Sequence, residues 1–275
     1  MKHYKNYIFD LYNTLIDIRT DEEKPALWRQ MAALYAANGA DYTGPALKKR
    51  YKEMVAEEEA VIIAEKGVRY PEIKLEKVFT RLLTEAPKKH DIFEPNDSGH
   101  AKKIDTEKFA EYMALTFRTL SRGHMKPFPH TIATLKALKN QGCGVYLLSN
   151  AQRTFTQSEL ELTGLLSLFD QVYISSDAGV RKPEPVFMMK LLTEHSLNTS
   201  DFVMVGDDFT CDAGVAAECG IHAIILNSWH LEKKELKKRL KTAQTGEALS
   251  PAARAFLMKN PPDIIESGDI AELLN

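Results

Sequence analysis

Residues 4–14 read Tyr-Lys-Asn-Tyr-Ile-Phe-Asp-Leu-Tyr-Asn-Thr, a stretch in which a short apolar run leads directly to an acidic residue. Residues 7–9, Tyr-Ile-Phe, form a short apolar run that is typical of a strand buried on both faces. The run ends at Asp10. Open α/β sheets place their chemistry at the carboxyl ends of strands, and a carboxylate there can act as a nucleophile. Taken alone, Asp10 is better explained by a turn or a helix cap, so the residues that accompany it decide its role.

Composition excludes several classes of function. The 275 residues suit one large or two modest domains, and the hydrophobic content of 44% and charged content of 27% are ordinary for a globular protein. The net charge of -2 gives no overall field that would attract nucleic acid or a membrane surface. No apolar stretch approaches the ~18 residues that cross a bilayer, and the three cysteines lack metal-site spacing. We therefore expect a cytoplasmic protein with a small-molecule substrate and no nucleic-acid or membrane partner.

The chain has helical spacing of apolar residues from residue 18 to about residue 120. The expected helices cover 24–38, 43–66, a segment after Pro71, and 105–120. The polar residues 86–103 predict a long loop between the last two of them. Residues 18–120 are therefore expected to form an all-helical cap domain, inserted after the first strand.

After residue 121 short apolar strands alternate with helices. The expected strands are 144–148, 171–175, 201–205, 222–226 and 263–265. Such alternation predicts right-handed βαβ units and a mostly parallel sheet with helices on both faces. The fold class is therefore α/β: a Rossmann-like parallel sheet core, formed by residues 1–17 and 121–275, with the cap inserted. Residues 231–259 interrupt the alternation with a basic helix, for which a solvated face is favoured; it either packs on the core or forms a dimer contact.

Polar residues follow four of the core segments. They are Asp10 with Thr14, Ser149 with Asn150, Lys182, and Asp207 and Asp208 with Asp212. Because the carboxyl ends of parallel strands meet at one edge of a sheet, we expect these side chains to lie together.

The combination suits attack on a phosphate. A carboxylate nucleophile cannot approach a phosphate dianion unless that charge is offset, and Mg²⁺ held by oxygen ligands does this. The candidate ligands are the carboxylates of Asp10, Asp207, Asp208 and Asp212 and the main-chain carbonyl of Tyr12. The hydroxyl of Ser149 is placed to bind phosphate oxygens, and Lys182 to offset negative charge. Thr14 is expected to orient Asp10 or to donate to the phosphate. Each residue alone is better explained as part of a turn, a cap or a solvated side chain, and only the combination favours a site.

The four segments together resemble the motifs of the haloacid dehalogenase superfamily. The resemblance rests on Phe9-Asp10-Leu-Tyr-Asn-Thr-Leu15, Leu148-Ser-Asn150, Arg181-Lys-Pro-Glu-Pro185 and Val205-Gly-Asp-Asp208 with Asp212. It covers the expected core, and the helical insertion sits where that family carries its first type of cap. The resemblance implies Asp10 as nucleophile, Ser149 as phosphate-binding, Lys182 as charge-stabilising, and Asp207 with its neighbours as the Mg²⁺ acids.

Tyr12 departs from the phosphatases of this family, which usually carry a second Asp at that position as general acid and base. A phenol with a pKa near ~10 is a poor base at neutral pH. The 2-haloacid dehalogenases of the family carry Tyr there and an Arg in an early cap helix, which Arg29 resembles. They lack the metal-binding acids, however, and this chain retains Asp207, Asp208 and Asp212.

Three functions follow from this mixture. A Mg²⁺-dependent phosphatase of a small phosphorylated metabolite, acting through a covalent intermediate on Asp10, is favoured. The second is a 2-haloacid dehalogenase in which Arg29, Ser149, Asn150 and Lys182 recognise the substrate carboxylate. The third is a weakly active or inactive binding homologue that retains the metal pocket. The protein is expected to be a monomer or a homodimer.

Overall fold

The computed structural model describes residues 2–87, 105–195 and 198–275. The chain divides into two compact units. The first comprises Met1–Ile18, Val68–Glu72 and Met125–Asn275, and the second comprises Arg19–Gly67 and Ile73–His124. From residue 88 onward, the loop expected at 86–103 lies outside the described residues.

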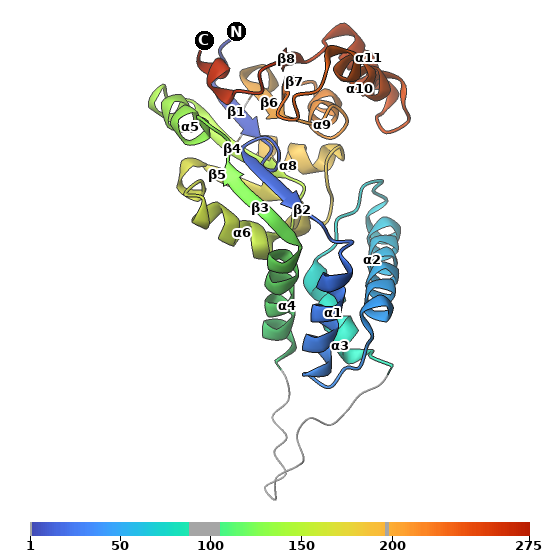
Figure 1. The fold of residues 1–275 in the computed structure, drawn as a ribbon. Helices are drawn as coiled ribbons and strands as arrows, with labels where there is room; N and C mark the ends of the chain where they lie inside the picture. Colours follow the sequence, from blue (N-terminus) through green and yellow to red (C-terminus); the bar gives the residue numbers. More distant parts are fainter. Residues whose placement is uncertain (1, 88–104, 196–197) are drawn as a thin grey trace, which may run out of the picture. The chain divides into compact units, whose positions relative to one another are not determined.

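A six-stranded sheet forms the centre of the first unit, in the order β5-β4-β1-β6-β7-β8 (Figure 1). The strands are β1 (Asn6–Phe9), β4 (Gly144–Ser149), β5 (Gln171–Ile174), β6 (Phe202–Gly206), β7 (His222–Leu226) and β8 (Asp263–Ile265). All five pairings are parallel, as predicted. The strand that carries Asp10 at its end is therefore central, with β4 on one side and β6 on the other.

Helices cover both faces of this sheet. Alternate side chains of β1 divide between two cores, because Tyr7 and Phe9 join one apolar cluster and Ile8 joins the other. The first face is covered by α5 (Thr131–Asn140), α6 (Arg153–Leu162), η1 (Leu166–Leu168) and η3 (Ile270–Leu274). The second is covered by α8 (Pro185–Glu194), α9 (Asp212–Glu218), α10 (Lys233–Thr245) and α11 (Pro251–Lys259). The short α7 (Ser175–Ala178) and η2 (Thr199–Asp201) lie in connections. This confirms the α/β class.

The basic insertion forms the pair α10 and α11 and packs on the core. Leu236 and Ala243 of α10 and Ala253 and Leu257 of α11 are buried in the apolar cluster on the second face. The sequence left open whether this segment packs on the core or forms a dimer contact. In the structure its apolar stripe is buried against the core, as the first alternative predicts.

The second unit contains α1 (Pro25–Ala36), α2 (Gly44–Lys66), α3 (Leu75–Thr84) and α4 (Thr106–Ser121). These helices enclose a core of their own, in which the rings of Trp28, Tyr51, Phe79 and Phe117 lie 5.1–5.9 Å apart. Two strands, β2 (Ile16–Thr20) and β3 (Arg122–Pro127), pair where the chain passes between the units. Neither strand was expected, because their alternating charged residues hide the strand pattern.

Residues 68–72 lie within the range expected for the cap but group with the first unit. Pro71 forms an antiparallel bridge with Val180, and the N–H of Arg181 donates to the carbonyl of Tyr70 at 2.9 Å. The carboxylate of Glu72 accepts hydrogen bonds from Ser175 Oγ at 2.9 Å and from the side chain of Gln152. The segment is thus hydrogen-bonded to the loop that leads to Lys182.

Among the described residues, no helix combines the length and the apolar character that a membrane crossing requires.

Candidate active site

Asp10 lies directly after β1, where main-chain pairing with β6 fixes its position. Its N–H donates to the carbonyl of Val205 at 2.9 Å, which continues the register Phe9↔Val205 by one residue. The carboxyl ends of β1, β4 and β6 therefore bring together Asp10, Ser149 and Asp207, as their spacing in the sequence predicts.

A buried cation holds Asp10. Nζ of Lys182 lies 2.6 Å from Oδ1 of Asp10 and 2.7 Å from Oδ1 of Asp212. The Lys182 side chain is 1% exposed. Burial alone would lower the pKa of Lys182, but attraction to the two carboxylates outweighs it and raises the pKa above its usual value. The ammonium therefore stays charged and fixes one oxygen of each acid.

The residues after β4 support this cation. The side chain of Asn150 accepts from the N–H of Lys182 at 2.7 Å and donates to its carbonyl at 3.1 Å. Asn150 thus holds the lysine backbone on both sides, in addition to lining the cavity described below. The hydroxyl of Ser149 is fully buried and has no hydrogen-bond partner among the described residues. A buried polar atom in this state calls for a partner. Ser149 does not line the cavity itself, and its role in phosphate binding stays a prediction.

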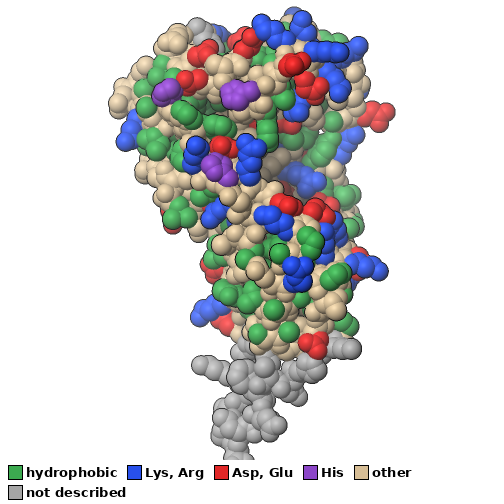
Figure 2. Space-filling model, in the orientation of Figure 1, with side chains coloured by type: hydrophobic (Ala, Val, Ile, Leu, Met, Phe, Trp, Pro, Cys, Tyr) green, Lys and Arg blue, Asp and Glu red, His purple; other side chains and the backbone are tan. Residues whose placement is uncertain are grey.

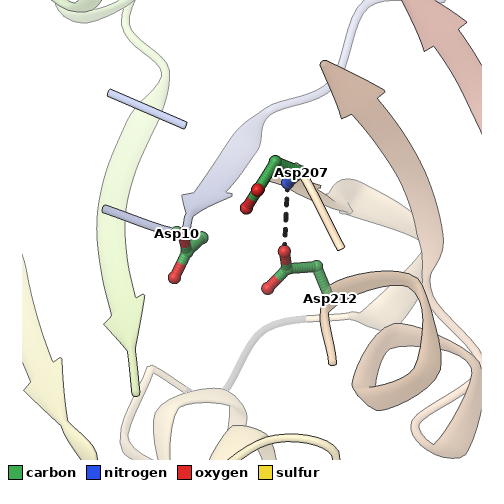
Figure 3. Close-up of side chains that lie close together, drawn as sticks. All are labelled: Asp10, Asp207 and Asp212. Carbon is green, nitrogen blue, oxygen red and sulfur yellow. Dashed lines mark hydrogen bonds between the residues drawn. The ribbon is translucent and has the colours of Figure 1, made fainter. Parts of the chain in front are cut away.

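The acids after β6 come together around a glycine. Oδ2 of Asp212 accepts from the N–H groups of Asp207 at 3.1 Å and Asp208 at 3.0 Å, the first of which is drawn in Figure 3. A Cβ on Gly206 would lie 2.2 Å from the same oxygen, so only glycine leaves room for this carboxylate at the strand end.

Asp10, Asp207 and Asp212 form a group that suits a hard cation. Each can offer one oxygen, and these three atoms lie within 4.8 Å of one another. Each of these acids also has a hydrogen-bond donor near both of its oxygens, so the three are alike in this respect. Mg²⁺ usually takes one or two carboxylates and several waters, and this group offers enough of them. The donor set therefore fits Mg²⁺.

The pKa of Asp207 agrees with this assignment. Burial and the nearby charge of Asp10 raise it to about 6. Burial likewise raises the pKa of Asp212, although Lys182 opposes the shift. Acids held close together raise one another's pKa values, and a divalent cation relieves their repulsion.

Thr14 links the first and fourth motifs. Its hydroxyl lies 3.1 Å from Oδ2 of Asp10 and 3.3 Å from Oδ1 of Asp207. Because one hydroxyl has a single proton, it can donate to only one of these oxygens at a time. This position fits the predicted role of orienting Asp10.

Tyr12 is engaged away from these acids. Its phenol donates to Oε2 of Glu159 at 2.5 Å and lies 3.0 Å from Oγ1 of Thr156. Both partners are buried on α6. The phenol therefore anchors the first motif to α6, and its proton points at Glu159 rather than at a leaving group.

Two of the predicted site residues lie in other surroundings. Oδ1 of Asp208 accepts from the N–H groups of Thr210 and Cys211 at 2.8 and 2.6 Å, as a turn cap before α9, although the residue lines the cavity. Asp208 is outside the group of three acids. Arg29 is an exposed residue of α1 in the second unit, and its role in substrate binding stays a prediction.

The sequence did not point to Trp229 or Arg239. Both line the same cavity of about 400 Å³ as Asp10 and Lys182. The indole N–H of Trp229 donates to Oδ2 of Asp207 at 2.7 Å. Trp229 follows β7 closely, so its place after a parallel strand was a usable signal; nothing in the pattern of α10 singled out Arg239 from its neighbouring lysines.

Comparison with known proteins gives a consistent result. A family model described as haloacid dehalogenase-like hydrolase matches residues 4–220. The chain is similar to the glyceraldehyde 3-phosphate phosphatase of Methanothermobacter thermautotrophicus, with 27% identity over 58% of this chain and 62% of that protein. It is also similar to the ribulose-1,5-bisphosphate 5-phosphatase of Halopiger xanaduensis, with 30% identity over 38% of this chain and 43% of that protein. The chain thus spans less than two thirds of the length of either relative.

Among solved structures, the 2-haloacid dehalogenase from Pseudomonas syringae pv. Tomato DC3000 has a similar fold. It aligns over 98% of both chains with a TM-score of 0.59 and 19% identity. At this identity the match concerns the fold alone.

Proposed function

Because the chain belongs to the haloacid dehalogenase-like hydrolase family, we propose that it is a Mg²⁺-dependent phosphatase of a small phosphorylated metabolite that acts through Asp10. The observation that carries this proposal is the group of Asp10, Asp207 and Asp212 with oxygens within 4.8 Å of one another. Attack by a carboxylate on carbon needs no such cluster of acids, whereas attack on a phosphate requires the cation that they can hold. Similarity to relatives named as phosphatases supports the same choice.

In the first step a carboxylate oxygen of Asp10 attacks phosphorus. The bond from phosphorus to the leaving oxygen breaks, and its electron pair departs with that oxygen. Lys182 holds the other Asp10 oxygen, so the nucleophile is oriented before the substrate arrives. The bound Mg²⁺ would offset charge between the carboxylate and the phosphoryl group. Water then attacks phosphorus of the acyl phosphate, which releases inorganic phosphate and restores the Asp10 carboxylate.

The leaving group receives little help with its proton. The phenol of Tyr12 donates to Glu159, so it is not directed at the departing oxygen. General acid catalysis typically contributes about 10²–10⁴-fold. The enzyme should therefore prefer phosphates with good leaving groups, such as aryl phosphates, over simple alkyl phosphates.

A 2-haloacid dehalogenase is the second candidate, and Tyr12 is the observation that favours it. Halide leaves without a proton, so such an enzyme needs no general acid at this position, and the hydrogen bond from the phenol to Glu159 would not slow it. In this case Asp10 would form an ester with carbon, and the metal would have no role.

A parallel assay separates the two. Purified protein is given para-nitrophenyl phosphate or a 2-haloacid, each with Mg²⁺ and with EDTA, and Asp10→Asn is the control. The phosphatase releases phosphate only with Mg²⁺, whereas the dehalogenase releases halide that survives EDTA. If the wild-type protein releases no phosphate in the presence of Mg²⁺, the proposal is overturned.

A further inference from the structure

Trp229 and Arg239 come from the segment between β7 and β8, outside the four motifs, yet they line the cavity that contains Asp10. Trp229 lies in the turn after β7 and Arg239 lies on α10. Because Leu236 and Ala243 anchor α10 in the core, this helix holds a fixed position beside the site. The segment therefore supplies a wall of the substrate cavity.

Arg239 is the cation that this wall offers to a substrate. Among the described residues that line the cavity, the other basic side chain is Lys182, which is committed to Asp10 and Asp212. Only Nε of Arg239 has a hydrogen-bond partner in the described part of the chain, Oε1 of Glu235 at 3.2 Å. The terminal nitrogens are left for a ligand, and the side chain is 44% exposed. A guanidinium with its Nη1–Nη2 edge free suits a carboxylate or a phosphate.

The surface around Arg239 also favours anions. From Lys233 to Lys241, α10 carries six Lys or Arg residues and one Glu. Figure 2 shows Lys and Arg side chains gathered over the region of α10 and α11. A basic helix next to the cavity raises the local concentration of anionic substrates.

Trp229 gives the same wall a flat apolar surface. Trp229 is 46% exposed, and its indole N–H donates to Asp207, which orients the ring. A substrate portion between the reacting phosphate and Arg239 can therefore lie against the indole.

We propose that Arg239 binds a second anionic group, a carboxylate or a phosphate, that the substrate carries at a distance from the phosphate attacked by Asp10. This subsite rests on the proposed phosphatase function and narrows its substrate class to phosphate esters with a remote second anion. Arg239 acts in specificity rather than in the chemical step.

The test uses pairs of substrates that differ only in the second anion. The ortho-, meta- and para-carboxyphenyl phosphates are compared with their methyl esters, in Mg²⁺, by kcat/KM for phosphate release. The wild type should prefer at least one acid over its ester. Arg239→Gln should reduce kcat/KM for that acid about 10-fold, mostly through KM, since a charge-assisted hydrogen bond contributes a factor of about that size. The value of kcat/KM for the ester should stay within about twofold of the wild type. Arg239→Lys should retain part of the preference.

Lys238→Gln is the matched control. Lys238 lies on the same helix and pairs with the same Glu235, at 3.6 Å, but does not line the cavity. Its removal should leave the preference unchanged. The subsite is overturned if Arg239→Gln lowers kcat/KM equally for the acid and the ester, or lowers it for neither. It is also overturned if Lys238→Gln lowers kcat/KM for the acid as much as Arg239→Gln does. If the wild type cleaves none of the phosphates, the proposed function itself fails; if it cleaves them all without preference, only the subsite fails.

Discussion

Replacing Lys182 with Met should strongly destabilise the first unit. The side chains of Lys182, Asp10 and Asp212 are 1%, 11% and 2% exposed, and the ammonium lies 2.6 and 2.7 Å from the two carboxylates. Methionine has a similar volume, so packing changes little, but two buried acids lose their counter-ion. Breaking a buried ion pair by removing one partner costs about 3–5 kcal/mol. For a unit of this size we expect a Tm lower by ~6–20 °C.

The pH dependence tests the electrostatic cause. The pKa of Lys182 is raised in the folded protein, so its contribution is fully present below the ordinary lysine pKa and is lost only at high pH. Asp207 and Asp212 have pKa values that burial raises in the folded protein, and Lys182 lowers both of them. In Lys182→Met these two acids therefore bind protons more readily in the folded state than in the unfolded state. The variant should therefore lose stability as pH rises from about 5 to 8, while the wild type does so less.

Thermal unfolding, followed by circular dichroism in EDTA, measures both effects, with Lys139→Met as control. Nζ of Lys139 lies 2.5 Å from Asp170, but these side chains are 33% and 39% exposed. Its loss should cost no more than about 1 kcal/mol. Equal Tm changes in Lys139→Met and Lys182→Met, or a Lys182→Met deficit that is independent of pH, would refute the reasoning.

Three further predictions concern the same site. Gly206→Ala should displace the carboxylate of Asp212, because an added Cβ would lie 2.2 Å from its oxygen. We expect the free energy of unfolding to fall by about 1–3 kcal/mol and Mg²⁺ to bind more weakly. Unchanged Tm and Mg²⁺ affinity would contradict this prediction. Tyr12→Phe should lower the free energy of unfolding by about 1–3 kcal/mol, because buried Glu159 loses a hydrogen-bond donor. Activity on aryl phosphates should stay within a few-fold of the wild type. A hundredfold drop in activity at unchanged Tm would instead make the phenol a catalytic acid. Because the pKa of Asp207 is raised to about 6, the metal-free protein should lose stability as pH rises from about 4 to 6. The Kd for Mg²⁺, measured by tryptophan fluorescence, should fall over the same range and then level off. A Kd that stays constant from pH 5 to 7 would be inconsistent with this prediction.

Much of the fold could be predicted from the sequence because its signals are local. Buried parallel strands appear as short apolar runs, and the residue that ends each run marks the edge where chemistry collects. This pattern predicted that Asp10, Ser149 and Asp207 lie at that edge, and the strands place them there. The strands β2 and β3 were missed because Asp17, Arg19 and their neighbours break the apolar pattern, and their pairing joins residues about a hundred positions apart.

The contributions that the sequence did not predict come from tertiary contacts. The phenol of Tyr12 could not be assigned to Glu159, because the two are 147 residues apart. Asp208 and Asp207 are adjacent and chemically identical, and only the turn before α9 separates their roles. The place of Arg239 depends on how α10 packs on the sheet, which periodicity does not specify.

The central claim is that Asp10 forms a covalent bond to phosphorus. The most direct measurement is peptide mass spectrometry of enzyme mixed with para-nitrophenyl phosphate and Mg²⁺ and quenched in acid within one turnover. We expect one added phosphoryl group on the peptide that contains Asp10, absent with EDTA and absent in Asp10→Asn. Phosphate release without that modification, or a phosphoryl group that persists in Asp10→Asn, would contradict the account.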